Sequence, residues 1–152
     1  MYITLLCIFL AFSLFNKLFY PFSMALNSFK TLDAYKIGYR LSMEIFNISK
    51  TFPKDESYSI TSQIRRSSRS ICSNLAEGYR KRMYLKHFLS KLTDSDAECS
   101  ETSVWLDYCK DCNYISEIQY KNLIQLCQQT GKILGYMIEH PEKYFDGNFI
   151  VD

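Results

Sequence analysis

Hydrophobic residues recur every three or four positions through most of the chain, and polar residues fill the positions between them. This spacing is typical of α-helices that bury one face, and no stretch shows the strict alternation expected of a half-buried β-strand. We predict four helices, over about residues 31–52, 60–82, 84–112 and 116–140. The short connections between them favour an all-α, antiparallel up-down-up-down four-helix bundle.

The predicted second helix has the clearest two-sided pattern. Its inward stripe consists of Ile60, Ile64, Ser68, Ile71, Leu75 and Tyr79. The basic residues of the segment lie off this stripe or at its end, and they are Arg65, Arg66, Arg69, Arg80, Lys81 and Arg82. We therefore expect a helix that packs into the bundle with one face and presents cations on the other.

Several helix ends carry capping or stop signals. Thr31 or Asp33 is suited to cap the first helix, because a short polar side chain can accept a hydrogen bond from a free backbone N–H. The pair Phe52-Pro53 ends that helix, since proline cannot continue the hydrogen-bond pattern. Ser116, followed three residues later by Gln119, predicts a capping box at the start of the fourth helix.

The first 23 residues differ from the rest of the chain. Residues 2–15 are almost wholly apolar, and Asn16 and Lys17 interrupt the run before it reaches the length of a membrane-spanning helix. Three interpretations remain: a membrane anchor, a targeting peptide, or an extension ahead of a translation start at Met24. We favour the extension, because AT-rich DNA encodes this mixture of residues. A membrane partner is expected only if this segment is real.

The length and composition of the chain indicate one domain, large enough to bury a hydrophobic core. The chain has 152 residues, of which 47% are hydrophobic, and only five glycines and three prolines interrupt it. We divide it into an apolar N-terminal extension (1–23), the bundle (24–141) and a C-terminal tail (142–152).

The cysteines do not form the framework of a small disulfide-rich protein. Six are spread along the chain, mostly at apolar helical positions, which indicates a reducing cytoplasm. The spacing Cys109-x-x-Cys112 matches half of a zinc or redox motif, but no second paired element accompanies it. We therefore predict no metal and no cofactor.

Charge is segregated along the sequence although the net charge is only +2. Residues 61–91 contain eight basic side chains and one acidic side chain, a net charge of +7. Residues 92–112 contain six acidic side chains and one basic side chain, a net charge of −5. Such a distribution provides a basic binding surface, or it lets two neighbouring helices or subunits attract each other.

A polar strip runs along the predicted second helix. Ser70, Asn74 and Gly78 (or Glu77) recur at helical spacing, and such small or polar residues permit close approach and hydrogen bonding to another helix. We interpret the strip as a seam that fixes helix register or oligomeric state. A catalytic role for Glu77 is disfavoured, because no histidine, nucleophile or metal-ligand cluster accompanies it in the sequence. We therefore predict that the protein is not an enzyme.

The segment QIRRSSRSICSNLAEGYRK resembles the signature of the small four-helix bundle protein family. That family includes proteins encoded in intervening sequences of bacterial large-subunit ribosomal RNA genes, and accessory proteins of diversity-generating retroelements are related to it. The resemblance covers about residues 29–138. It implies a homo-oligomer, with pentameric relatives, and a protein partner such as a reverse transcriptase. A glutamate recurs in the third helix of the family, and Glu98 or Glu101 matches its place in the predicted seam.

Two hypotheses of function follow. In the first, the protein is an accessory protein that binds nucleic acid, with structured RNA favoured, because the arginines of the second helix neutralise phosphates without reading bases. In the second, the protein is a structural or adaptor homo-oligomer, in which the basic second helix binds the acidic third helix of the same or a neighbouring subunit.

Overall fold

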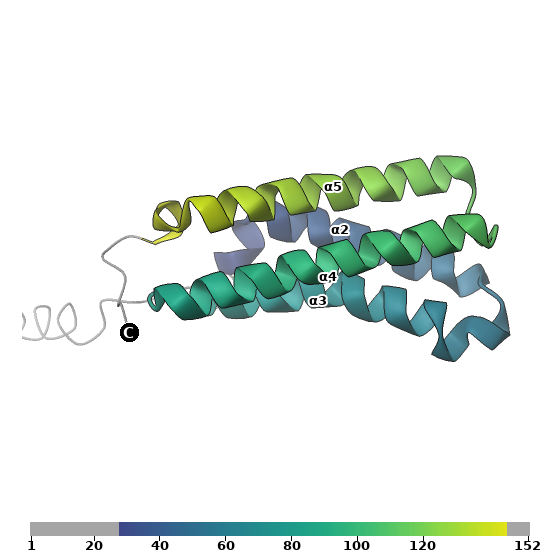
Figure 1. The fold of residues 1–152 in the computed structure, drawn as a ribbon, viewed down its shortest axis with the longest axis horizontal. Helices are drawn as coiled ribbons and strands as arrows, with labels where there is room; N and C mark the ends of the chain where they lie inside the picture. Colours follow the sequence, from purple (N-terminus) through teal and green to yellow (C-terminus); the bar gives the residue numbers. More distant parts are fainter. Residues whose placement is uncertain (1–27, 146–152) are drawn as a thin grey trace, which may run out of the picture.

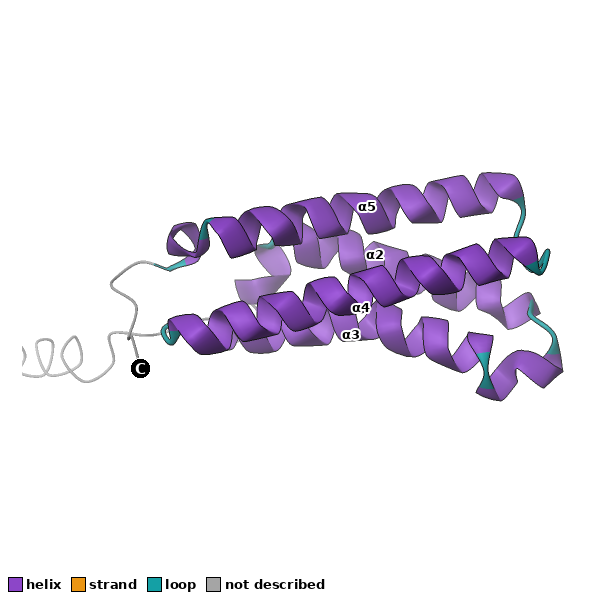
Figure 2. Cartoon of the chain, viewed as in Figure 1, coloured by secondary structure: helices purple, strands orange, loops and turns teal. Residues whose placement is uncertain are grey.

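The structure, a computed structural model, describes residues 28–145, and four long helices lie side by side in it (Figure 1). They are α2 (Asp33–Ile48), α3 (Ile60–Arg80), α4 (Leu85–Asp111) and α5 (Glu117–Glu139). Short 3-10 helices flank or connect them: η1 (Ser28–Thr31), η2 (Ser49–Thr51), η3 (Lys54–Tyr58) and η4 (Pro141–Tyr144). Between residues 28 and 145 the chain forms no strand (Figure 2), which confirms the predicted all-α four-helix bundle.

The predicted N-terminal extension, residues 1–23, lies outside the described residues, as do residues 146–152 of the predicted tail. None of the described helices combines the length and the apolar character needed to cross a bilayer.

The helices form a ring in which sequence neighbours are also neighbours in space. Helix α3 packs against α2 and α4, and α5 closes the ring by packing against α4 and α2. Short connections at alternate ends make each helix antiparallel to the next (Figure 1).

One apolar core runs along the inside of this ring. The fully buried large side chains include Leu41, Ile45, Ile64, Ile71, Leu75, Phe88, Leu92, Leu106, Leu123, Leu134 and Met137. The stripe predicted for the second helix is buried from Ile60 to Leu75, and its last member, Tyr79, is half-buried. The basic residues between these positions are therefore turned away from the core, apart from the exceptions described below.

The predicted helix ends agree with the structure except in α2, where both the cap and the end differ. Helix α2 ends at Ile48, and the chain continues as the 3-10 helix η2 up to Thr51, just before Phe52-Pro53. The N-cap of α2 is Leu32, which makes no side-chain capping bond, so the prediction of Thr31 or Asp33 as the cap was wrong. Thr31 instead donates its hydroxyl hydrogen bond to the Ser28 carbonyl, at 2.7 Å, within η1. The capping box is confirmed: Ser116 and Gln119 each accept a hydrogen bond from the other's backbone N–H.

Glu56 ties the α2–α3 connection to the α4–α5 turn at one end of the bundle. Its carboxylate accepts hydrogen bonds from the Tyr114 hydroxyl at 2.9 Å, from the Ser59 hydroxyl and from the backbone N–H of Ile60 at 3.3 Å. These donors, Ser59 first and Tyr114 second, lower the pKa of the Glu56 carboxyl. The Phe52 ring packs against Tyr114, with centroids 5.6 Å apart.

Candidate nucleic-acid interface

The outer face of α3 carries most of the predicted cationic residues. Arg66, Arg69, Arg80 and Lys81 are exposed, and Arg65 is half-buried. We call these five residues the basic face. Arg69 and Arg80 are eleven residues apart, three turns of an α-helix, so they project from nearly the same side about 16 Å apart along the axis. Within residues 28–145, Arg69, Arg80 and Lys81 form no ion pair.

Three cationic side chains lie close to the ring of Phe46 of α2, at one end of the basic face. The guanidinium carbons of Arg65 and Arg69 lie 5.1 Å and 5.5 Å from the centroid of its ring. The Lys50 ammonium nitrogen lies 4.5 Å from the same centroid. The Arg65 Nε also donates a hydrogen bond to the Ser49 hydroxyl at 2.7 Å. These contacts hold the arginines in place without neutralising their charge, because an aromatic ring and a hydroxyl carry no net charge.

Arg66 is used differently, because it bridges α3 to α4. Its guanidinium pairs with Glu101 at 2.6 Å and with Glu98 at 3.4 Å. The Trp105 indole N–H donates to the same Glu101 carboxylate at 3.0 Å, and this bond, followed by Arg66, lowers the pKa of Glu101. Two carboxylates therefore offset the charge of Arg66 inside one chain, and the cationic character of this region comes chiefly from Arg65 and Arg69.

A surface pocket of about 610 Å³ extends from the end of η3 along α3 as far as Ser73, and we call it the arginine pocket. Its lining combines cations, hydroxyl groups and one tyrosine: Ser57, Tyr58, Thr61, Ser62, Arg65, Arg66, Arg69, Ser70 and Ser73. Guanidinium groups and hydroxyls are the groups that bind phosphate oxygens, so the chemistry of this pocket suits an anionic ligand.

Arg82, the last of the six predicted binding residues, lies apart from the basic face. It is buried, its guanidinium carbon lies 4.1 Å from the centroid of the Tyr79 ring, and it donates to the Tyr79 carbonyl at 2.8 Å. Arg82 therefore supports the end of α3 rather than presenting its charge to solvent. The sequence could not distinguish it from Arg80 and Lys81, because all three follow each other at the helix end.

The part of the polar strip from Asn74 to Gly78 faces α4 within the same chain. Lys91 of α4 pairs with Glu77 at 3.1 Å and donates a hydrogen bond to Asn74 at 3.1 Å. Asp94, one turn further along α4, pairs with the same ammonium group at 3.3 Å. These carboxylates, Glu77 first, raise the pKa of Lys91. Gly78 is buried beside this group, while Ser70 lines the arginine pocket.

The cysteines of the predicted Cys-x-x-Cys spacing do not share an environment. Cys109 is buried, and burial raises the pKa of its thiol to about 12, whereas Cys112 is exposed. Cys99 of α4 instead approaches Cys127 of α5, with their sulfurs 3.4 Å apart. Across the described part of the chain, no group of three or more metal-ligating side chains is placed to hold an ion.

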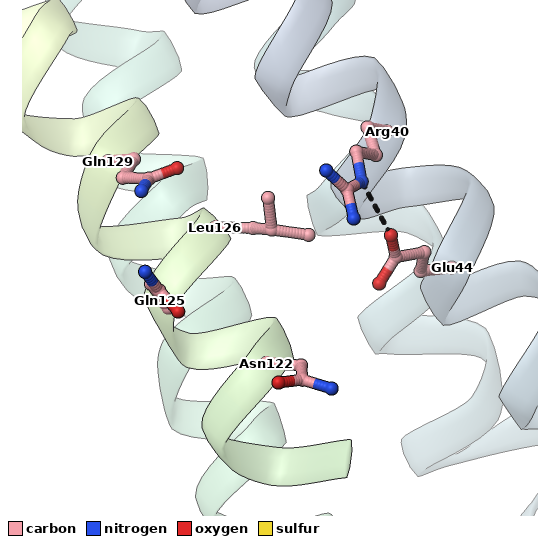
Figure 3. A pocket seen from close by; sticks show the side chains of 6 residues that line it. All are labelled: Arg40, Glu44, Asn122, Gln125, Leu126 and Gln129. Carbon is pink, nitrogen blue, oxygen red and sulfur yellow. Dashed lines mark hydrogen bonds and ion pairs between the residues drawn. The ribbon is translucent and has the colours of Figure 1, made fainter. Parts of the chain in front are cut away.

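A second pocket, of about 270 Å³, lies between α2 and α5 (Figure 3). The α5 side presents the amides of Asn122, Gln125 and Gln129, and the α2 side presents an ion pair between Arg40 and Glu44, 2.7 Å apart. The charges of that ion pair cancel and amides are neutral, so this pocket lacks the cationic character of the arginine pocket.

Sequence reasoning missed two aromatic residues that shape the basic region. Nothing in the sequence marks Phe46, because its contacts with Arg65 and Arg69 cross between two helices. Tyr58 does have a signal in the sequence, because it is a large aromatic residue in a polar connection directly before the basic helix. A search for aromatic residues near the arginines in sequence finds Tyr58 but not Phe46, which approaches them only through the pairing of α2 with α3.

Comparisons with known proteins agree with this architecture. The chain is similar to a solved protein of unknown function from the S23 ribosomal protein family of Bacteroides thetaiotaomicron, at 24% sequence identity and with a TM-score of 0.64. That similarity covers 70% of this chain and 98% of the solved chain, and at this identity it shows the fold alone. Among curated proteins, none matches.

A family model described as 23S rRNA-intervening sequence protein matches residues 30–136, which is well over half of the chain. The matched region extends from η1 into the last turns of α5, so it includes all of α3 and the arginine pocket. The resemblance inferred from the central helix is thereby confirmed. The chain belongs to the family of 23S rRNA-intervening sequence proteins.

Proposed function

We propose that the protein is a non-enzymatic accessory protein that binds structured RNA through the basic face of α3. The observation that carries the proposal is the arginine pocket, where Arg65 and Arg69 are held by Phe46 and surrounded by hydroxyl groups. The name of the matching family refers to ribosomal RNA, which supports RNA as the nucleic acid.

The proposed contact is with the phosphate backbone. Arginine neutralises a phosphate and releases its counterions, so affinity should fall as salt rises. Such contacts position an RNA without reading its sequence, and the protein would therefore select RNA by shape. Lys81 and Arg80, at the far end of the basic face, would extend the contact along the helix.

We further propose that the protein acts as a homo-oligomer, with a pentamer as the form implied by the family resemblance. An oligomer repeats the basic face on each subunit, and several weak phosphate contacts made together give a stronger overall association than one alone. The proposal of a protein partner, such as a reverse transcriptase, is based on family analogy.

A second candidate function is a structural or adaptor oligomer. The ion pairs of Arg66 with Glu98 and Glu101 support it, because they join the basic helix α3 to the acidic helix α4 within one chain. In this view the remaining charges make the same kind of contact between subunits, or with a protein partner.

Charge reversal distinguishes the two candidates. We would measure the mass of the full chain by light scattering at near-physiological salt, alone and with a mixture of structured RNAs. The test variant is Arg65→Glu with Arg69→Glu, and the control is Lys30→Glu with Lys132→Glu, which changes the net charge equally at exposed positions of η1 and α5. Circular dichroism checks that each variant keeps its helices.

The RNA proposal predicts that the wild-type oligomer gains RNA mass. It also predicts that the test variant keeps its oligomeric mass and loses at least tenfold in RNA affinity, an effect the control does not show. An oligomer that ignores RNA would refute the proposal. Dissociation of the oligomer in the test variant alone would favour the adaptor function.

A further inference from the structure

Tyr58 is the most exposed large hydrophobic side chain in the described part of the chain. It is 96% exposed, whereas the next most exposed, Ile118, is 72% exposed. Tyr58 is the last residue of η3, and no ring contact or side-chain hydrogen bond to another described residue holds it. A tyrosine ring left in water contributes none of the stabilising free energy that its burial would provide. The residues around Tyr58 therefore indicate what kind of ligand could cover the ring.

Those surroundings are cationic and polar. Tyr58 lines the arginine pocket together with Arg65, Arg66 and Arg69, which follow it within three turns of the chain. The remaining wall consists of serine and threonine hydroxyls, and no aliphatic side chain lines it. An apolar segment of a protein partner would find one aromatic ring here and no aliphatic side chain beside it. A nucleotide presents a flat ring beside an anionic phosphate, and the pocket offers a flat ring beside fixed cations.

We propose that the arginine pocket binds an unpaired nucleotide, with its base stacked on Tyr58 and its phosphate held by Arg65 and Arg69. This inference rests on the proposed RNA-binding function and narrows it to RNA with single-stranded loops, bulges or ends. A base can stack on a protein ring only when it is splayed out of the helix, because a paired base is already stacked on its neighbours.

The two parts of the proposed contact have different properties. The arginines are fixed by Phe46 and Ser49, so they bind the phosphate of any nucleotide and their contribution is sensitive to salt. The tyrosine ring stacks on any base and is much less sensitive to salt, because stacking involves no net charge. Replacing Tyr58 should therefore remove the preference for unpaired RNA while leaving binding of duplex RNA intact.

The test is fluorescence anisotropy with the full chain and two labelled RNAs of equal nucleotide count. One is a hairpin with a large unpaired loop, and the other is a blunt duplex. Three variants are compared with the wild type: Tyr58→Ala, Tyr58→Phe, which keeps the stacking ring, and Tyr108→Ala. Tyr108 is a matched control on α4, because it is also exposed (53%) and does not line the arginine pocket.

We expect the wild type to bind the hairpin about tenfold more tightly than the duplex, as one stacked base would provide. Tyr58→Ala should lose this preference, and Tyr58→Phe and Tyr108→Ala should keep it. Equal binding of both RNAs by the wild type, or a preference that Tyr58→Ala retains, would overturn the inference and leave the proposed function standing. Failure of the wild type to bind either RNA would refute both.

Discussion

Gly78 sets the distance between α3 and α4 at one point of their contact. A methyl group in place of its hydrogen would lie 2.9 Å from the Lys91 Cβ and 3.6 Å from the Phe88 ring. The nearer contact involves an atom attached directly to the backbone of α4, which cannot turn aside as the end of a flexible side chain can. Even alanine would therefore push the two helices apart.

We predict that Gly78→Ala lowers the free energy of unfolding by about 1–3 kcal/mol, as expected for an overpacked core position. Gly135→Ala is the matched control, because nothing lies within 4 Å of the added methyl group in α5. That control should raise the free energy of unfolding by about 0.5–1 kcal/mol through helix propensity alone. Urea denaturation followed by circular dichroism measures both, and shifts of the same sign would contradict the packing argument.

For a single residue, the sequence predicts the helix face on which its side chain lies more easily than the residue that the side chain contacts. The spacing of Asn74 and Gly78 places both on one strip, because helical periodicity is local. That Lys91 is the residue they meet depends on the relative register of α3 and α4, which the intervening turn and the core packing determine together. For the same reason Phe46 could not be linked to Arg65 and Arg69 from the sequence.

Among the four long helices, α5 has the most completely capped N-terminus. Ser116 accepts a hydrogen bond from the Gln119 backbone N–H at 3.2 Å, and the Gln119 side chain accepts one from the Ser116 backbone N–H at 2.8 Å. Both bonds satisfy backbone donors that have no partner within the helix. The N-cap of helix α2, Leu32, makes no side-chain capping bond, so the start of that helix depends on packing instead.

We predict that Ser116→Ala lowers the free energy of unfolding by about 1 kcal/mol through loss of this cap. Ser100→Ala is the control, because Ser100 is exposed in the interior of α4 and caps no helix. Its effect should stay within about 0.5 kcal/mol of zero. Thermal and urea unfolding of the two variants provide the comparison, and equal losses would show that the capping box contributes nothing specific.

The elements themselves could be predicted well because their signals are local. The stripe from Ile60 to Leu75 fixes the buried face of α3, and the Ser116 signal marks the start of α5 within one residue. The start of α2 at Asp33 agrees with the prediction, but its cap does not, because Thr31 joins the 3-10 helix η1 before α2, and no sequence rule distinguishes that use of a threonine from a helix cap.

For the whole molecule, Glu56 links two connections that are far apart in sequence. Its carboxylate joins η3 to Tyr114 in the α4–α5 turn. The pKa of Glu56 is lower in the folded protein than in the unfolded chain. Its ionised form therefore stabilises the bundle fully above the unfolded pKa, near 4.3, and this contribution is lost as the pH falls through the folded pKa.

We predict that Glu56→Gln lowers the melting temperature at pH 7, and that the difference from the wild type shrinks as the pH falls below about 4. The amide keeps the shape of the side chain but lacks the charge, so the protonated wild type and the variant should converge. Asp55→Asn is the control, because Asp55 is an exposed neighbour in η3. A difference between Glu56→Gln and the wild type that stays constant with pH would contradict the electrostatic explanation.

Because the four long helices are antiparallel in sequence order, the described chain starts and finishes at the same end of the bundle. η1 contacts α3 and η4 follows α5 at that end of the bundle, while η3 lies at the other (Figure 1). The arginine pocket begins at Ser57 and Tyr58 of η3 and extends from there along α3. Helix α3 separates the two ends by about 30 Å. A fluorescent protein or a sensor surface attached through the η1 or η4 end would therefore leave the arginine pocket facing outward. The arginine pocket therefore lies toward the end of the bundle opposite to the point of attachment, whereas Arg80 and Lys81 lie at the attached end.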